Sequence, residues 1–543
     1  MCIRDRFKSV RYFRDVQIAD PLINELHNSY SLQSIADRHG MPGKDQVLLE
    51  QAARAYNVDA KTGMWRLPPQ FVGPYAEQDV RLPLALLRRQ ERIIDDEGLW
   101  DIYNLESRLL PVLIRMRRRG VRVDLDKLAQ VERWARGEAA AALGEVHART
   151  GCLLGFDDVW QATAMAAPLR AIGVVFKAGV KESVTKELLG SLKHPVADAL
   201  LKARKMNKLV TTFAASVRTY QTNGRIHCTL NQLRKTKEGS DGDEDLDGGD
   251  EGGARYGRLS CSDPNLQQQP ARDEFAKLWR SIYLPEEGAQ WYANDYSQQE
   301  PRWLTHFAEI CEQAGYRGMQ GASIAAQRYR DDPNTDNHDM MTRIIHGDLV
   351  DTWEKAIYKK YRTFCKQIYL GMCYGMGGVK LCRNLGFPTK RIPHWNRDKA
   401  EKGITVEVAG DEGQAIIDKF NRGAPFVRGL AKICEDKAAK TGVIITVLGR
   451  HCHFPALEGG GWDWTHKALN RLIQGSSADQ TKKALVEADA AGCYITLQVH
   501  DEIGGSGDER EARLCAEIMK TCVPCNVPAK VDIEIGPSWG GSM

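Results

Sequence analysis

Apolar residues recur at helical spacing over residues 100–119, and Gly120 closes that pattern. Residues 121–123 then alternate between apolar and polar, which predicts a short strand. A long exposed helix is predicted over residues 126–150, and two further helical patterns fall within residues 183–222. This part of the chain is therefore expected to be mainly helical.

The pattern changes after residue 255. Short strand-like runs at 289–295 and 493–499 flank a helix-rich segment at roughly 301–440. A sheet interrupted by a long helical segment is an α+β arrangement. The chain is therefore expected to contain a small sheet with helices inserted between its strands.

The second strand-like run predicts a β-hairpin. Ile495, Leu497 and Val499 alternate with other residues, and Gly504–Gly505 would permit a turn. The tripeptide His500-Asp501-Glu502 would then lie near the hairpin tip.

Composition narrows the class of protein. The 543 residues are enough for roughly three or four domains. No apolar run approaches the length of about 18 residues that a membrane helix needs, and no secretory signal follows the first residues. Fourteen scattered Cys do not suggest a disulfide framework, and the pair Cys522 and Cys525 lacks the second pair of a zinc site.

Charge is unevenly distributed along the chain. The net charge is +4, but residues 238–251 hold eight acids and no Lys or Arg. Without that segment 75 basic residues face 63 acids, a balance of +12. The Gly- and Asp-rich segment 236–254 is expected to be disordered, and the remainder is basic enough to bind nucleic acid. A mildly basic enzyme that binds no nucleic acid would have the same balance of charge.

Two carboxylates end strand-like runs that lie far apart in the sequence. Asp295 ends the run WYAND, and Asp501 lies at the predicted hairpin tip. If the two strands share a sheet edge, this pair could hold two Mg²⁺ ions about 3.5–4 Å apart for phosphoryl transfer. Each Asp taken alone is also an ordinary turn residue.

A basic stripe is predicted on the helical segment YRTFCKQIYLGMCYGMGG. Arg362, Lys366, Leu370 and Tyr374 are spaced four apart, so they follow one side of the helix. The order of two cations, an apolar residue and a phenol matches the order of triphosphate, sugar and base in a nucleotide. A solvated basic helix face would give the same spacing of cations.

Five segments, taken together, resemble a known family. DYSQQEPR (295–302), RTFCKQIYLGMCYG (362–375) and QVHDE (498–502) are similar to motifs A, B and C of the family A DNA polymerases, the DNA polymerase I group. GRLSCSDPNLQQQP (257–270) and NRLIQGSSAD (470–479) resemble the primer-template segments of that family. The resemblance runs from about residue 100 to the C-terminus, in family order, and points to phage-like members.

The resemblance implies a role for each matching residue. It implies metal binding by Asp295 and Asp501, with Glu502 beside them, and triphosphate binding by Arg362, Lys366 and His338, with Lys366 also a proton donor. It implies that Glu300, Gln298, Leu370 and Tyr374 border the incoming nucleotide, and that Glu300 blocks a ribose 2′-hydroxyl. It implies primer-template contacts by Arg258, Asn265, Gln267, Asn470, Gln474 and His500.

Three positions depart from the family pattern. Leu370 stands where cellular relatives carry Phe and some phage enzymes carry Tyr, at a ring position that governs sugar discrimination. His466 stands where Arg is usual, which puts that DNA contact in doubt. Pro301 replaces the usual Leu, a change associated with phage-like members.

Residues 1–96 resemble the end of the family's ribonuclease H-like 3′–5′ exonuclease domain. Tyr75 and Asp79 match its last motif, which implies a water-orienting phenol and a metal ligand. The Asp-x-Glu of the first motif is missing, and the second motif is not recognisable. The leader MCIRDR suggests an incomplete N-terminus, so we expect little or no proofreading from this chain.

The expected architecture is a right hand behind an exonuclease remnant. Its parts are a remnant at 1–96, a thumb with connecting helices at 97–225, a first palm part at 226–300, fingers at 301–440 and a second palm part at 441–543. The expected partners are primer-template DNA, deoxynucleoside triphosphates and other viral replication proteins, for a monomer in the host cytoplasm. A degenerate DNA-binding protein, a nuclease and a single-subunit RNA polymerase are the alternatives, and the intact Asp pair, the missing exonuclease carboxylates and Glu300 respectively argue against them.

Overall fold

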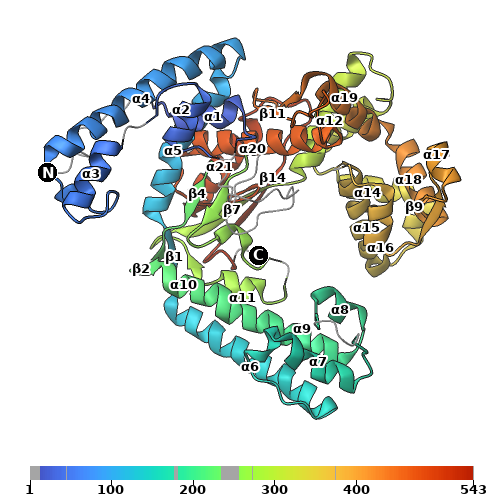
Figure 1. Cartoon of the computed structure of the whole chain (residues 1–543). Coiled ribbons are helices and arrows are strands. Elements are labelled where there is room, and N and C mark those ends of the chain that lie inside the picture. The colour runs from blue at the N-terminus through green and yellow to red at the C-terminus, as the bar shows by residue number, and fades with distance from the viewer. Residues whose placement is uncertain are drawn as a thin grey trace.

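The computed structural model describes residues 13–27, 29–43, 46–176, 182–233, 256–271, 273–373 and 375–541. A central sheet carries two helical bodies that stand apart from each other, and the N-terminal helices, drawn in blue, extend to the upper left of the sheet (Figure 1). Among the described residues, no helix is long and apolar enough to cross a membrane.

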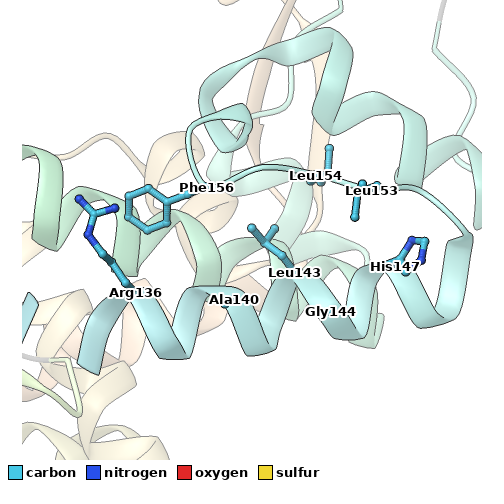
Figure 2. Close-up of a pocket in the computed structure, with 8 residues that line it drawn as sticks. All are labelled: Arg136, Ala140, Leu143, Gly144, His147, Leu153, Leu154 and Phe156. Atoms are coloured by element: carbon cyan, nitrogen blue, oxygen red, sulfur yellow. The ribbon is translucent and has the colours of Figure 1, made fainter. Parts of the chain in front are cut away.

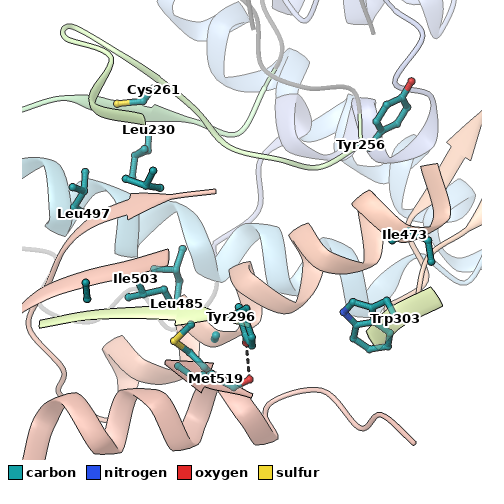
Figure 3. Packing of buried hydrophobic residues seen from close by; sticks show 14 of the residues in the cluster. Leu230, Tyr256, Cys261, Tyr296, Trp303, Ile473, Leu485, Leu497, Ile503 and Met519 are labelled. Atoms are coloured by element: carbon teal, nitrogen blue, oxygen red, sulfur yellow. Dashed lines mark hydrogen bonds between the residues drawn. The ribbon is translucent and has the colours of Figure 1, made fainter. Parts of the chain in front are cut away.

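The central sheet is antiparallel and has the strand order β12-β13-β7-β14. Its strands are β7 (Gln290–Tyr296), β12 (Ile495–Val499), β13 (Glu502–Gly507) and β14 (Val531–Gly536). The helices α20 (Ala468–Ala490) and α21 (Glu509–Thr521) pack against it. Tyr296 fixes one contact, because its hydroxyl donates to the Met519 carbonyl at 2.6 Å (Figure 3). Both predicted strand-like runs thus belong to one sheet.

The hairpin of β12 and β13 was predicted with His500-Asp501-Glu502 near its tip, which the structure confirms, but Gly504–Gly505 do not form the turn. Gly504 and Gly505 lie inside β13, and the turn is made at His500 and Asp501, where His500 has φ 55°. A Cβ on Gly505 would approach the Tyr292 ring to 2.2 Å. These glycines therefore let β13 lie against the aromatic side chains of β7, and they do not form the turn.

The predicted thumb is built from two long antiparallel helices and shorter ones. Its elements are α5 (Trp100–Arg119), β1 (Val121–Val123), α6 (Leu125–Thr150), η3 (Asp158–Trp160), α7 (Ala162–Ala171), α8 (Lys186–Ser191), α9 (Pro195–Lys208), the π-helical η4 (Leu209–Ala214) and α10 (Ala215–Tyr220). Gly120 ends α5 with φ 65°, as its sequence position predicts. A separate apolar core joins α6 and α9, and Leu143 and Phe156 line a pocket beside it (Figure 2).

A second small sheet, β2-β3-β1-β6, ties the thumb to the centre. Its further strands are β2 (Gln221–Thr222), β3 (Arg225–Ile226) and β6 (Tyr283–Leu284), and the adjoining segment holds β4 (Thr229–Asn231), β5 (Ser260–Ser262), η5 (Leu266–Gln268) and α11 (Ala276–Arg280). The acidic segment 236–254 lies outside the described residues.

The predicted fingers are mainly helical, as expected. They comprise α12 (Gln299–Gln313), α13 (Ala322–Asp331), α14 (Asn337–His346), η6 (Gly347–Thr352), α15 (Lys355–Cys373), α16 (Gly378–Leu385), α17 (Arg397–Glu401), α18 (Asp411–Gly423) and α19 (Pro425–Thr441). A hairpin of β8 (Thr389–Pro393) and β9 (Thr405–Ala409) was not predicted. Most of β8 is exposed, so it carries no alternation of buried positions. The strands β10 (Val443–Ile445) and β11 (His451–His453) and the short η7 (Thr465–Lys467) then lead to α20.

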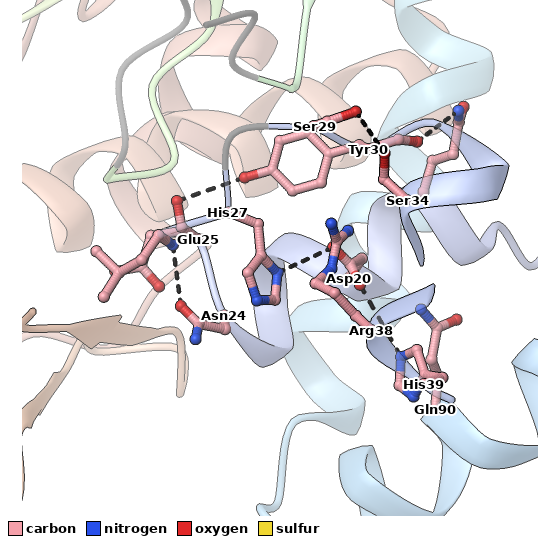
Figure 4. A network of polar contacts seen from close by, with 12 residues as sticks. Asp20, Asn24, Glu25, His27, Ser29, Tyr30, Ser34, Arg38, His39 and Gln90 are labelled. Atoms are coloured by element: carbon pink, nitrogen blue, oxygen red, sulfur yellow. Dashed lines mark hydrogen bonds and ion pairs between the residues drawn. The ribbon is translucent and has the colours of Figure 1, made fainter. Parts of the chain in front are cut away.

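The N-terminal region contains η2 (Met64–Arg66) and the helices α1 (Val16–Ile23), α2 (Leu32–Arg38), α3 (Val47–Ala55) and α4 (Pro69–Asp96), and its described residues form no strand. Buried Asp20 on α1 receives ion pairs from Arg38 and His27 (Figure 4). Ile18 and Leu22 of α1 belong to the main apolar core. This region is therefore packed into the molecule.

Candidate active site

The sheet brings the two predicted metal-binding carboxylates together. Asp295 near the end of β7 is in register with Glu502 of β13, and Asp501 precedes Glu502 in the turn. The carboxyl groups of Asp295 and Asp501 share a hydrogen bond. Two residues that are far apart in the sequence thus form one acidic pair at the sheet edge.

The acidic pair is costly to charge in the absence of cations. Burial and then the neighbouring Asp501 carboxylate raise the pKa of Asp295 to about 8. Burial also raises the pKa of Asp501, although the Arg258 guanidinium opposes that shift. Two carboxylates that are this close and partly desolvated are both ionised only when a cation compensates their charge.

Glu502 is held on the sheet by a residue from the C-terminal end of the described chain. The indole N–H of Trp539 donates to Glu502 at 3.0 Å, and Trp539 stacks on Trp291 with the Arg280 guanidinium over its ring. Burial raises the pKa of Glu502 to about 7, and Arg280 and the indole donor oppose that shift. Sequence reasoning did not find Trp539, because its distance from the motifs along the chain hides the contact.

Arg258 and Glu300 form an ion pair at 2.7 Å beside the acidic pair. Arg258 precedes β5, and Glu300 lies in the first turn of α12, which directly follows β7. The predicted primer-binding residue and the predicted ribose gate are therefore neighbours, and the charge of Arg258 also acts on Asp501.

Gln298 links the sheet to the fingers. It has a left-handed backbone conformation (φ 55°) just before α12. Its side-chain oxygen accepts from the Asn337 backbone N–H at 2.8 Å, at the start of α14. Gln298 therefore fixes the position of α14 beside the sheet edge, which sequence alone did not suggest.

Helix α15 carries the predicted basic stripe, with Lys366 exposed and Leu370 half-buried. Arg362 is engaged by two carboxylates of α14: Asp336, and Asp339 at 2.6 Å. The sequence analysis did not identify these two acids as partners of the stripe, although both lie beside His338 in the segment TDNHDMM.

His338 is buried between α14 and α15, edge-on to the Tyr369 ring. Burial, then the charges of Lys366 and Arg362, lower its pKa to about 4, against the opposing effect of Asp336. Its Nδ1 atom is buried and has no hydrogen-bond partner among the described residues. The imidazole is therefore neutral near pH 7, and it lies close to Lys366 and Arg362, the two cations of the stripe.

The far end of the stripe is described only in part. Tyr374 lies outside the described residues. Gly375 has φ 68°, and a Cβ there would approach the His466 carbonyl to 3.2 Å. The segment after α15 thus passes close to η7, where His466 stands.

The remaining predicted DNA contacts lie on two segments. Gln267 donates to the Gln498 side chain at 2.8 Å, and Gln498 donates to the His500 carbonyl at 2.5 Å. Asn265 caps η5, which contains Gln267. The structure therefore joins η5 to the hairpin turn that holds Asp501. Asn470 and Gln474 lie on the first turns of α20.

Tyr75 and Asp79, the predicted exonuclease remnant, lie one turn apart on α4. Tyr75 packs against the small apolar cluster around Leu49. Neither residue belongs to the acidic pair of the sheet. Among the described residues, no group of three His, Cys, Asp or Glu side chains gathers in a geometry that could hold a metal ion.

The acidic pair nevertheless fits a divalent cation. Mg²⁺ is commonly bound by one or two carboxylates, with its other ligands supplied by water and substrate phosphates. Asp295 and Asp501 provide those two carboxylates, and their raised pKa values reflect crowded, partly desolvated negative charge that a cation would neutralise.

Comparison with known proteins agrees with this geometry. The profile of DNA polymerase family A matches residues 169–541. A DNA-directed DNA polymerase of Pseudomonas phage M6 is 52% identical, over 99% of this chain and 80% of its own length. DNA polymerase DpoZ of Salmonella phage PMBT28 is 30% identical, over 96% of this chain and 83% of its own length.

The fold is also that of a solved polymerase. The POL domain of Pol1 from M. smegmatis, solved in complex with DNA primer-template and dNTP, matches with a TM-score of 0.72 and 22% identity, over 97% of this chain and 82% of that chain. The predicted right-hand α+β architecture is confirmed by this likeness. With its profile, its phage relatives and its fold in agreement, this chain belongs to DNA polymerase family A.

Proposed function

We propose that the chain is a phage replicative DNA polymerase, which extends a primer on a DNA template with deoxynucleotides. The observation that carries this proposal is the Asp295–Asp501 pair, which lies at a sheet edge beside the Arg258–Glu300 ion pair. The named activity of the M6 relative supports it, since that protein is a DNA-directed DNA polymerase.

The reaction is attack of the primer 3′-hydroxyl on the α-phosphate of the nucleotide, with pyrophosphate as the leaving group. Two Mg²⁺ ions, held by Asp295 and Asp501, would neutralise the developing charge on the attacking and leaving oxygens. Arg362 and Lys366 bind the triphosphate, His338 contributes a neutral donor, and Lys366 gives a proton to pyrophosphate. Catalysis rests on positioning and charge neutralisation.

The remaining residues set what is bound. Glu300 excludes a 2′-hydroxyl, and Leu370 and Tyr374 border the sugar and base of the incoming nucleotide beside Gln298. The primer terminus and template are held by Arg258, Asn265, Gln267, Asn470, Gln474 and His500, with Glu502 beside the acidic pair. The parts retain the expected organisation: thumb at 97–225, fingers at 301–440 and palm from the segments 226–300 and 441–543.

Primer extension with Mg²⁺ and the four deoxynucleotides tests the proposal, with Asp501→Ala as the variant. The wild-type chain is expected to extend the primer, and the variant is expected to lose at least about 10³-fold in rate. The matched control is Asp351→Ala, which removes a carboxylate of a surface pair with Arg343. A wild-type chain that binds primer-template but never extends it would favour the DNA-binding alternative.

We propose further that this chain does not proofread. Tyr75 and Asp79 on α4 lack the other carboxylates that a two-metal nuclease needs, and the described residues 13–96 form only helices. Incubation of a 3′-mismatched primer with Mg²⁺ and no nucleotides is expected to leave it intact. Shortening of the primer from its 3′ end would contradict the proposal that this chain does not proofread.

The polymerase itself is proposed to act as a monomer in the cytoplasm of the host cell, alongside other viral replication proteins.

A further inference from the structure

Four charged side chains form a connected, buried network that does not include the acidic pair. Glu106, Arg450, Asp479 and Lys482 are 3%, 7%, 0% and 2% exposed. Arg450 bonds to Glu106 and, through Nε at 2.8 Å, to Asp479, while Lys482 bonds to Glu106 at 2.6 Å. Two acids face two bases, so the network is neutral as a whole.

The network joins three elements that are remote in the sequence. Glu106 comes from α5, Arg450 from the turn between β10 and β11, and Asp479 from α20. Thr446 in the same turn donates to Asp479 at 2.6 Å and accepts from the Arg450 backbone N–H at 3.1 Å. The turn is thereby fixed to α20 through both side chains.

One DNA-binding segment lies directly against the Arg450 side chain. Gly257 has φ 82°, and a Cβ at this residue would stand 2.6 Å from Arg450 Nε. The next residue is Arg258, whose guanidinium reaches Glu300 and the charge of Asp501. The backbone that carries Arg258 is therefore packed against the Arg450 guanidinium.

The second DNA-binding segment meets the same turn. Gly475 on α20 follows Gln474, and a Cβ on Gly475 would stand 2.6 Å from the Thr446 methyl group and 3.6 Å from the Tyr256 carbonyl. The turn that holds Arg450 thus touches both segments proposed to hold the primer terminus. Glycine at 257 and 475 makes both close approaches feasible.

We propose that Arg450 is a positioning residue for the primer terminus, acting through Gly257 on Arg258 and through Asp479 on the helix of Gln474. This inference rests on the proposed function. A buried ion network is weak evidence for stability, because well-packed apolar residues often serve as well. An Arg fork that binds two carboxylates and also supports a backbone turn instead fixes geometry, and a Lys cannot reproduce that fork.

A double-mutant cycle tests the proposal. Arg450→Met is expected to slow nucleotide addition about tenfold or more at saturating DNA and nucleotide, with little change in the Kd for primer-template. Because Arg450 acts through Arg258, Arg450→Met combined with Arg258→Ala is expected to be no slower than the slower single variant. Combined with Lys366→Ala, on the distant stripe, the two losses are expected to multiply.

Controls separate positioning from loss of stability. Arg204→Met removes a half-buried Arg that donates to the carbonyls of Val159 and Val184 within the thumb. This variant is expected to lower Tm to a similar extent and to leave the rate of addition unchanged. If Arg450→Met does not fold, Arg450→Lys takes its place, because it keeps the charge. Arg450→Lys is expected to fold and still to add nucleotides more slowly than the wild-type chain, because a Lys cannot reproduce the Arg fork.

Gly257→Ala approaches the same contact from the DNA side and is expected to reproduce the slow addition of Arg450→Met. Losses that multiply between Arg450→Met and Arg258→Ala would overturn the proposal, as would a rate equal to that of the wild type. Failure of the wild-type chain to extend a primer would instead refute the proposed function, so the two failures are distinguishable.

Discussion

Arg362 is neutralised by two carboxylates of α14 before any nucleotide arrives. Asp339 accepts from its Nε at 2.6 Å, and both side chains are partly exposed. A triphosphate that binds Arg362 must compete with these acids and is repelled by them. At the residue scale, the ion pair is therefore expected to weaken the proposed binding of a nucleotide at Arg362.

Asp339→Asn is expected to lower the KM for deoxynucleotides by roughly threefold to tenfold, with kcat little changed, because it removes one competing charge. Steady-state extension of a single nucleotide measures both constants. Asp351→Asn, which weakens the surface pair with Arg343, is the matched control. A higher KM in Asp339→Asn would mean instead that this carboxylate orients Arg362 for the triphosphate.

Leu370 is half-buried on α15, the helix proposed to face the nucleotide, and the family resemblance links its position to sugar discrimination. Leu370→Tyr would place a phenol hydroxyl beside the sugar, where it can replace a missing 3′-hydroxyl. We expect the preference for deoxy- over dideoxynucleotides to fall by about tenfold or more, a change of roughly 1.4 kcal/mol. Competition between the two nucleotide types measures this ratio, and an unchanged ratio would refute the role of Leu370.

At the scale of elements, β11 is joined to the end of α1 by a buried His–Glu pair. Glu25 accepts from the His453 ring at 2.8 Å and from its backbone N–H at 2.6 Å. Burial disfavours the charged ring, but Glu25 outweighs that effect and raises the pKa of His453. A raised pKa stabilises the fold below about pH 6.5 and ceases to do so as the pH rises through the folded-state value.

His453→Gln is therefore expected to lower Tm by about 1 °C at pH 6, which corresponds to about 1 kcal/mol in a chain of this length, and by less at pH 9. Thermal unfolding followed across this pH range measures the difference. His394→Gln, on the exposed fingers hairpin, serves as the control. An equal decrease in Tm at both pH values would show that the imidazole stabilises the fold by packing and not by its charge.

Elements were predictable where one pattern dominated the local sequence. The stripe of α15 and the alternation in β12 gave the right type of element, and Gly120 gave the end of α5. Gly504 and Gly505 were wrongly assigned to the turn because glycine signals both turns and close packing, and only the position of Tyr292 decides between them. The β8 strand was missed because it is exposed and lacks a core-facing side.

At the scale of the whole molecule, the acidic pair could be predicted because two motifs of one family each contain an Asp. The contacts of Arg450 with Glu106, of Trp539 with Glu502 and of Arg362 with Asp336 could not. Each joins residues that carry no mutual signal in a single sequence. Such contacts arise only when the complete fold brings their elements together.

The N-terminal helices share the apolar core of the polymerase, through Ile18, Leu22 and Ile94. Deleting residues 1–96 would expose the surface that these side chains cover, at about 1.5–3 kcal/mol for each fully buried side chain. We expect the shortened chain to have a clearly lower Tm and a greater tendency to aggregate, as measured by thermal unfolding and light scattering. An unchanged Tm would show that the region is an independent appendage.

Trp539 connects the end of the described chain to the acidic pair through Glu502. In genetic terms, a nonsense codon shortly before codon 539 would leave every recognised polymerase motif intact and still remove this indole. Such late-truncating alleles would be scored as harmless by motif inspection. The packing of Trp539 on Trp291 means that they should instead behave as loss-of-function alleles.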